Sequence, residues 1–206
     1  MLVAHGLRLQ VGADFLHQLE VARGGLGYAL GSDLKAELVR EYERYRVVDE
    51  QIRGLEAEQK ARAQAGLGDA LEQVNRLMQL RSVGWQSSWV LVMEFFAWRA
   101  FRNQRQVAAC AGLTPTPYSS GDSEREQGIS KAGNRRVRTL MIELSWLWLR
   151  YQPGSALSQW FQRRFAGGGK RMRRIGIVAL ARKLLIALWR YVTDGVIPEG
   201  AVLKAV

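Results

Sequence analysis

The chain has 206 residues and a formal net charge of +11, and it is long enough to bury a core of one main domain plus an appendage. Its single cysteine, Cys110, excludes a disulfide framework and a cysteine zinc site and fits a reducing cytoplasm, and two early histidines, His5 and His17, argue against a histidine triad or metal cluster. Arg182 and Lys183 interrupt the longest apolar run, and no signal-peptide pattern opens the sequence, so neither a membrane span nor secretion is expected.

The positive charge is concentrated in the second part of the chain. Residues 1–70 carry 9 Lys and Arg against 11 Asp and Glu, whereas the remaining residues carry 21 against 8. Between residues 144 and 193 there are ten basic residues and no acidic one. Such one-sided charge predicts a polyanionic partner, most simply nucleic acid; a basic but inert surface is the alternative.

Residues 1–31 are rich in glycine and weakly patterned, but a long helix is predicted from Ser32 or Asp33 to about Ala65. Apolar residues recur along it at steps of three and four: Leu34, Leu38, Tyr42, Tyr45, Val48, Ile52 and Leu55. This seam is typical of a coiled coil and predicts pairing with another protomer. Core packing within the chain is an equal alternative.

Gly66-Leu67-Gly68 predicts a hinge, which divides the chain into a linker and coiled-coil-like segment, 1–68, and a helical domain, 69–206. One helix is expected before the turn at 81–85 and one after it, and the second is expected to end near Phe96. Helix, glycine turn and helix form a helix-hairpin-helix-like pattern, in which the turn at Gly84 can hold a DNA phosphate.

The run from Gly112 to Arg138 is the most informative part of the sequence. Its first ten residues hold two prolines, two glycines and several hydroxyl residues, which predict an irregular, tightly turning loop instead of a helix or strand. Cations follow at Lys131, Arg135, Arg136 and Arg138. Hydroxyl groups beside cations suit phosphate-directed chemistry, and a solvated loop before a basic helix is the alternative.

Three further helices are predicted over residues 135–151, 155–165 and 170–193. On the last one, a face that is apolar apart from Arg182 is expected to pack in the core: Ile175, Val178, Ala179, Arg182, Leu185 and Trp189. The basic outer face is expected to pack over a phosphate backbone: Arg171, Arg173, Arg174, Lys183 and Arg190. Because no strand signal is visible, the predicted fold class is predominantly α.

The same run resembles the C-terminal domain of the insertion sequence 110 family of transposases, and the likeness extends from about Arg76 to about Gly200. The matching elements are Gly112-Leu113-Thr114-Pro115, Ser120-Gly121 and Ile129-Ser130-Lys131-Ala132-Gly133-Asn134 through Arg138. At the turn before Gly84, relatives have a glycine and a proline where this chain has Ser82 and Trp85.

The resemblance implies roles for these residues. The serine before the glycine attacks a DNA phosphodiester in that family, which maps onto Ser120, with Ser119 as the alternative nucleophile. Gly112, Pro115, Gly121, Gly133 and Asn134 would shape the loop. DNA would be bound by Lys131, Arg135, Arg136, Arg138, Gly84, Arg171, Arg173 and Arg174.

Full members of the family begin with an acidic RuvC-like domain that binds divalent metal, and residues 1–70 do not show its pattern. The chain therefore resembles a truncated or split member, with no metal site of its own, Mg²⁺ expected only in the acidic domain, and no cleavage by this chain alone. The resemblance implies DNA as a partner, with a guide RNA of the element as a second candidate partner. It also implies pairing with another copy or with full-length transposase, at the nucleoid in the cytoplasm.

Two alternatives stay open. The chain could be an inert remnant that binds element DNA or RNA, or that pairs with full-length transposase and blocks it. A more remote alternative is a peripheral membrane protein that uses the basic C-terminal helix.

Overall fold

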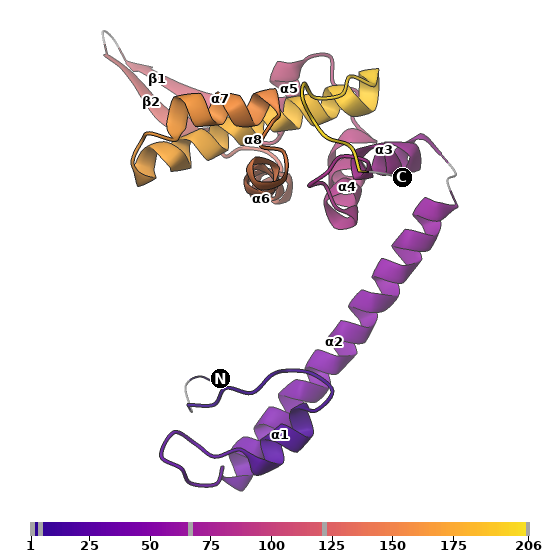
Figure 1. The fold of residues 1–206 in the computed structure, drawn as a ribbon, viewed down its shortest axis with the longest axis vertical. Helices are drawn as coiled ribbons and strands as arrows, with labels where there is room; N and C mark the ends of the chain where they lie inside the picture. Colours follow the sequence, from indigo (N-terminus) through magenta and orange to yellow (C-terminus); the bar gives the residue numbers. More distant parts are fainter. Residues whose placement is uncertain (1–2, 4–5, 66–67, 121–122, 205–206) are drawn as a thin grey trace. The chain divides into compact units, whose positions relative to one another are not determined.

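The computed structural model describes residues 3, 6–65, 68–120 and 123–204, which divide into two compact units, Met1–Ala61 and Arg62–Val206 (Figure 1). Helices account for most of the chain, so the predicted fold class, predominantly α, is confirmed. No helix within the described ranges is long and apolar enough to cross a membrane.

The first unit contains α1 (Phe15–Val21) and most of α2 (Ser32–Gln64). A small core forms where residues 7–19 pack on the start of α2: its buried members are Leu7, Phe15, Leu19, Leu38 and Tyr42. The rings of Phe15 and Tyr42 stack with centroids 4.6 Å apart, and the Tyr42 hydroxyl donates a hydrogen bond to the Gly12 carbonyl oxygen at 2.6 Å. The bounds of α2 confirm the long helix that was predicted from Ser32.

The apolar seam of α2 is used unevenly inside the chain. Leu38 and Tyr42 are buried against the N-terminal residues, whereas Tyr45, Ile52 and Leu55 are 47%, 49% and 59% exposed. Packing within the chain thus accounts for the first part of the seam only, and pairing of the second part with another protomer remains a prediction.

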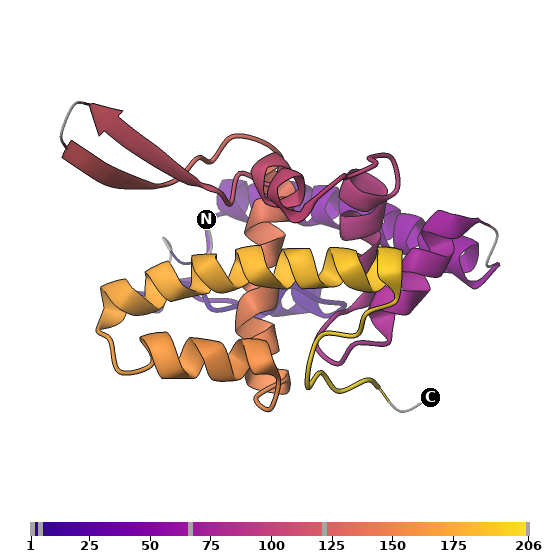
Figure 2. The same ribbon diagram turned by 90° about the horizontal axis from the view of Figure 1, so that it is seen from above.

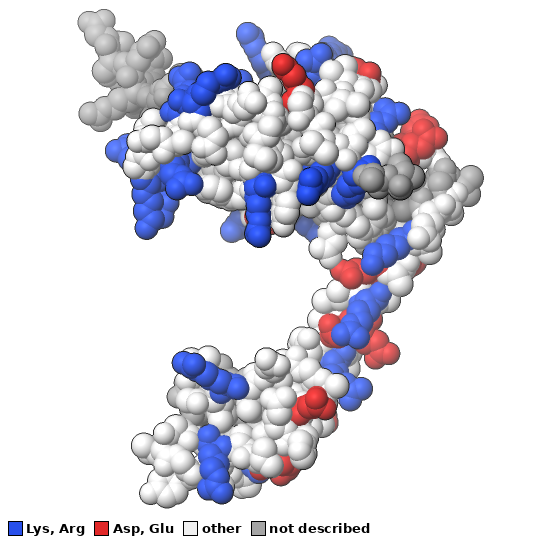
Figure 3. Space-filling view, viewed as in Figure 1, with Lys and Arg blue, Asp and Glu red and all other residues white. Residues whose placement is uncertain are grey.

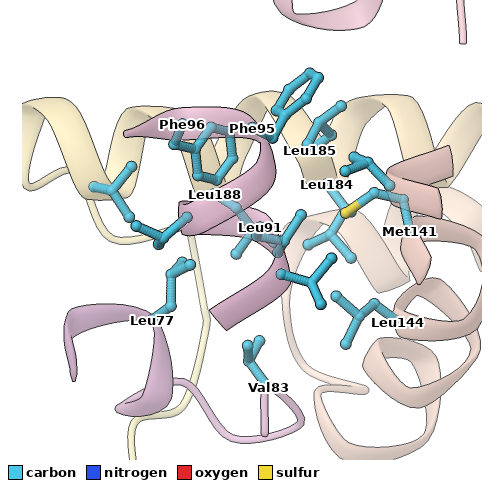
Figure 4. Packing of buried hydrophobic residues seen from close by; sticks show 14 of the residues in the cluster. Leu77, Val83, Leu91, Phe95, Phe96, Met141, Leu144, Leu184, Leu185 and Leu188 are labelled. Carbon is cyan, nitrogen blue, oxygen red and sulfur yellow. The ribbon is translucent and has the colours of Figure 1, made fainter. Parts of the chain in front are cut away.

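The second unit is built around α8 (Lys170–Asp194). It also contains α3 (Asp69–Met78), α4 (Trp85–Leu91), the π-helical turn η2 (Val92–Phe96), α5 (Gln104–Cys110), α6 (Arg135–Tyr151) and α7 (Ala156–Phe165). Helix α8 packs against α6, α7, α5 and α3, and its buried residues Leu184 and Leu188 lie in one cluster with Met141, Leu144 and Phe95 (Figure 4). The three C-terminal helices predicted from the sequence are confirmed, and Ser155 caps α7 through a hydrogen bond from the Ser158 N–H.

The predicted inward face of α8 is partly wrong. Ile175 is 50% exposed and Val178 is half-buried, while the fully buried side chains of α8 include Leu180, Leu184 and Leu188. Leu185 is buried as predicted, and both faces of α8 carry apolar side chains. Periodicity alone therefore could not tell which face meets the core.

The segment predicted as an irregular loop is a β-hairpin instead. Strands β1 (Pro115–Ser120) and β2 (Ser123–Ile129) pair antiparallel, with a register irregularity between Pro115 and Pro117. Pro115 and Pro117 suggested a turn, but a two-stranded ribbon has two edge strands, and edge strands tolerate residues that lack a backbone N–H. The hairpin extends away from the helices, with its foot beside α8 (Figure 2).

The turn between α3 and α4 is held by the C-terminal segment. Ser82 has φ +93°, a conformation that favours glycine, so the turn keeps a glycine-type backbone although the chain has serine there. The buried Gln152 side chain donates hydrogen bonds to the carbonyl oxygens of Arg81 and Val202, at 2.7 and 2.9 Å, and accepts one from the Val202 N–H at 2.7 Å. These bonds fix the turn before Gly84.

Candidate nucleic-acid-binding groove at the foot of the hairpin

Asn134 anchors the residues that follow the hairpin. Its side chain accepts a hydrogen bond from the Val137 N–H at 3.0 Å and so caps α6, while its own N–H donates to the Cys110 carbonyl oxygen at 2.8 Å. The first contact begins α6 and the second ties that beginning to the end of α5. Asn134 therefore joins the start of α6 to the end of α5.

Gly112 and Gly133 allow the two ends of this segment to touch. Their φ angles are +68° and +98°, and a Cβ atom would lie 2.0 Å from the Ala132 carbonyl oxygen at Gly112 and 2.2 Å from the Cys110 carbonyl oxygen at Gly133. The same two ends are also joined by a hydrogen bond that the Lys131 N–H donates to the Gly112 carbonyl oxygen at 3.2 Å. No other residue type fits either position without moving the backbone, which fixes where the hairpin leaves the helical body.

Ser120 is the last residue of β1, and its backbone pairs with Ser123 across the ribbon. Ser119 pairs with Glu124 in the same way. Gly121 lies outside the described residues. At about 3.3 Å per residue, the strand carries Ser120 roughly 17 Å from Pro115 at the foot of the hairpin.

Two of the predicted DNA-binding cations have partners within the chain. Arg136 forms an ion pair with Glu94 of η2, and the Arg138 guanidinium donates to the Ala111 carbonyl oxygen at 3.1 Å. Arg138 thus supports the end of α5 beside Gly112, whereas Arg135 at the start of α6 is exposed. The structure gives Arg138 a local structural role that the sequence did not predict.

A groove of about 940 Å³ lies between the foot of the hairpin and one face of α8, with contributions from α5 and α7. We call it the hairpin groove. The hairpin side is lined by Leu113, Pro115, Gly128, Ile129 and Lys131. The helical side is lined by Gln104, Leu157, Trp160, Arg171, Arg174, Ile175, Val178, Ala179, Arg182, Lys183, Ile186, Ala187 and Arg190.

Six cations line this groove, and none of the described residues around it is acidic: Lys131, Arg171, Arg174, Arg182, Lys183 and Arg190. Lys and Arg side chains project at many points over the face of this unit shown in Figure 3. Because like charges gathered at a concave surface raise the local positive potential, the groove attracts a polyanion.

The structure brings together three of the predicted DNA-binding residues, Lys131, Arg171 and Arg174. Arg173 is exposed but does not line the groove, and Gly84 caps α4, where its carbonyl oxygen accepts a hydrogen bond from the Ser88 N–H at 3.0 Å. Lys183 and Arg190, which the sequence placed on the basic outer face of α8, also line the groove, whereas Arg182 was grouped with the core-facing residues and lines the groove instead. Arg182 follows Arg171 by eleven residues, about three helical turns, and this spacing is the signal that could have placed it on the same face.

The described part of the chain contains no group of three or more His, Cys, Asp or Glu side chains that could hold a metal ion. The groove itself is lined by cations, apolar side chains and Gln104. That donor set suits phosphate oxygens and does not suit a divalent cation.

Comparison with known proteins finds similarity to transposases. Residues 74–160 match the family described as Transposase IS116/IS110/IS902 family. The chain is 47% identical over 195 residues to a putative transposase, y4rJ, of Sinorhizobium fredii, an alignment that covers 91% of this chain and 49% of that protein.

Two further relatives are more distant. A transposase for an insertion sequence element of Coxiella burnetii is 30% identical over 196 residues, covering 94% of this chain and 52% of the relative. One of Yersinia enterocolitica is 28% identical over 163 residues, covering 78% and 46%. The chain thus spans about half the length of the curated relatives that it matches.

Proposed function

Because the chain belongs to the IS116/IS110/IS902 family of transposases, we propose that residues 69–206 bind DNA and that Ser120 attacks a DNA phosphodiester during transposition. The observation that carries the DNA-binding part is the hairpin groove, which gathers six cations from the loop after β2 and from α8. A phosphate backbone is the polyanion that a transposase must hold.

A serine hydroxyl does not attack a phosphodiester unaided, so the proposed reaction requires a base, stabilising cations and a proton for the leaving group. A base takes the proton, cations stabilise the charge that develops on the phosphate, and the departing strand end accepts a proton as its bond to phosphorus breaks. The new bond joins the Ser120 oxygen to phosphorus, so the bond energy is kept for rejoining. Lys131, near the foot of the hairpin, and Arg135 are exposed cations that we assign to flanking phosphates of the bound DNA, since the foot lies roughly 17 Å from Ser120 along the strand.

We assign divalent metal, expected to be Mg²⁺, to an acidic domain of the kind that the sequence resemblance implies. When bound there, the metal supplies positive charge for the phosphate. This chain's own residues hold DNA and present the serine, and we expect no cleavage by the chain alone.

We further propose that α2 pairs with a second copy or with a full-length transposase. The exposed part of its seam supports this, since Tyr45, Ile52 and Leu55 are each about half-exposed apolar side chains on one helix face. The same surface supports the alternative role, an inert remnant that binds element DNA or a guide RNA and occupies a transposase partner. Either activity places the protein at the nucleoid.

Salt dependence of DNA binding tests the first part of this proposal. Because each phosphate neutralised releases counterions, affinity for duplex DNA should fall by orders of magnitude between about 50 and 200 mM salt. The measurement is fluorescence anisotropy of a labelled duplex across that range. Affinity that stays flat would remove the electrostatic argument.

A further inference from the structure

The hairpin groove has an apolar floor that phosphate binding does not require. Ile175 is 50% exposed, yet it lies between Arg171 and Arg174 on one side and Arg182 on the other. Val178, Ile186 and Leu157 continue the apolar surface beneath the cations. A duplex presents phosphates and sugars to a protein surface and stacks its base faces internally, so it would leave this floor uncovered.

An aromatic ring forms part of the groove wall. Trp160 of α7 lines the groove, and the Lys183 ammonium lies 4.8 Å from the centroid of its ring. Aromatic and aliphatic surface combined with cations along a groove is the combination that binds unpaired nucleotides, since the bases stack on or pack against apolar side chains while phosphates meet the cations.

We propose that the hairpin groove holds an unpaired stretch of DNA, with bases on the floor around Ile175 and phosphates at the rim formed by Arg171, Arg174 and Lys131. We choose DNA over RNA because this inference rests on the proposed function. Pro115, which lines the groove at the foot of the hairpin, begins the strand that carries Ser120. A strand held here would be separated from its complement at the foot of the hairpin, roughly 17 Å along β1 from the proposed nucleophile.

The test compares three oligonucleotides of equal length at one salt concentration: oligo(dT), a DNA duplex and oligo(U). Each is titrated against the wild-type chain and two variants, Ile175→Ser and Ile197→Ser. The control is matched, because Ile197 is 47% exposed, carries the same side chain and lies away from the hairpin groove. Neither substitution alters the net charge, so changes in phosphate attraction do not enter, and circular dichroism checks that both variants keep their helices.

We expect Ile175→Ser to lower the ratio of oligo(dT) affinity to duplex affinity by at least about fivefold, in line with the contribution of one base contact. Ile197→Ser should leave that ratio unchanged. If the chain binds duplex DNA tightly and Ile175→Ser does not change the ratio of oligo(dT) affinity to duplex affinity, this inference is wrong. The proposed function would not be affected by that result.

Two other results are equally decisive. If oligo(U) binds more tightly than oligo(dT) and shows the larger loss in Ile175→Ser, the groove is an RNA site and the commitment to DNA is wrong. If the chain binds none of the three, DNA binding itself fails, and the proposed function falls together with this inference.

Discussion

Gly112 approaches Ala132 so closely that a Cβ atom at position 112 would lie 2.0 Å from the Ala132 carbonyl oxygen. The contact joins the residue before the hairpin to the loop after it, and it sets where Pro115 and Lys131 enter the hairpin groove. The geometry of the proposed site therefore depends on a residue that takes no part in its chemistry.

Gly112→Ala should destabilise the fold and displace the hairpin. The φ of +68° alone costs an alanine about 1 kcal/mol or more, and the contact with the Ala132 carbonyl oxygen adds to that cost. Thermal unfolding measures the loss. Gly154→Ala is the control, because a Cβ there meets no atom within 4 Å and the backbone is not in the left-handed region. Equal melting temperatures for the two variants would show that the close approach is not needed.

Arg174 and Arg173 offer a matched test of the groove, because they are neighbouring exposed arginines on α8 and only Arg174 lines it. Arg174→Gln should weaken DNA binding and reduce the slope of log affinity against log salt by about one, as expected for the loss of one phosphate contact. Arg173→Gln should have the smaller effect, although it removes the same charge. Identical losses would mean that overall charge, and not the groove, determines binding.

The exposed seam of α2 leads to a prediction about assembly. Replacing Tyr45 and Ile52 with Lys places charges on the seam and should convert an oligomer into a monomer without unfolding residues 69–206. Val47→Lys is the control, since Val47 is 56% exposed on the same helix but lies off the seam. Sedimentation velocity reads the outcome. A wild-type chain that already sediments as a monomer would contradict the pairing.

The sequence predicted the helices well because their limits are marked locally. Ser155 before α7 is a capping residue in both sequence and structure, and Pro153-Gly154 separates α6 from α7. The hairpin was missed because Pro115 and Pro117 carry turn signals that an edge strand also accepts. Local turn signals of this kind do not predict which residues pair across a two-stranded ribbon.

The groove could not be predicted because it depends on packing between distant parts of the chain. Lys131 and Arg174 meet in it only because α6 and α7 fold α8 back beside the hairpin. Ile175 was assigned to the core, since an apolar side chain at helical spacing fits either face of α8. The roles of Arg136 and Arg138 also depend on tertiary contacts, with Glu94 and with the Ala111 carbonyl oxygen.

The central claim is that Ser120 attacks DNA, and a covalent adduct tests it most directly. The chain is combined with a family acidic domain supplied in trans, Mg²⁺ and element DNA, and the products are separated under denaturing conditions. We predict a protein–DNA adduct that Ser120→Ala abolishes and Ser119→Ala keeps, with DNA binding nearly unchanged in both because no charge is removed. An adduct that persists in Ser120→Ala would place the nucleophile at another residue and contradict the account.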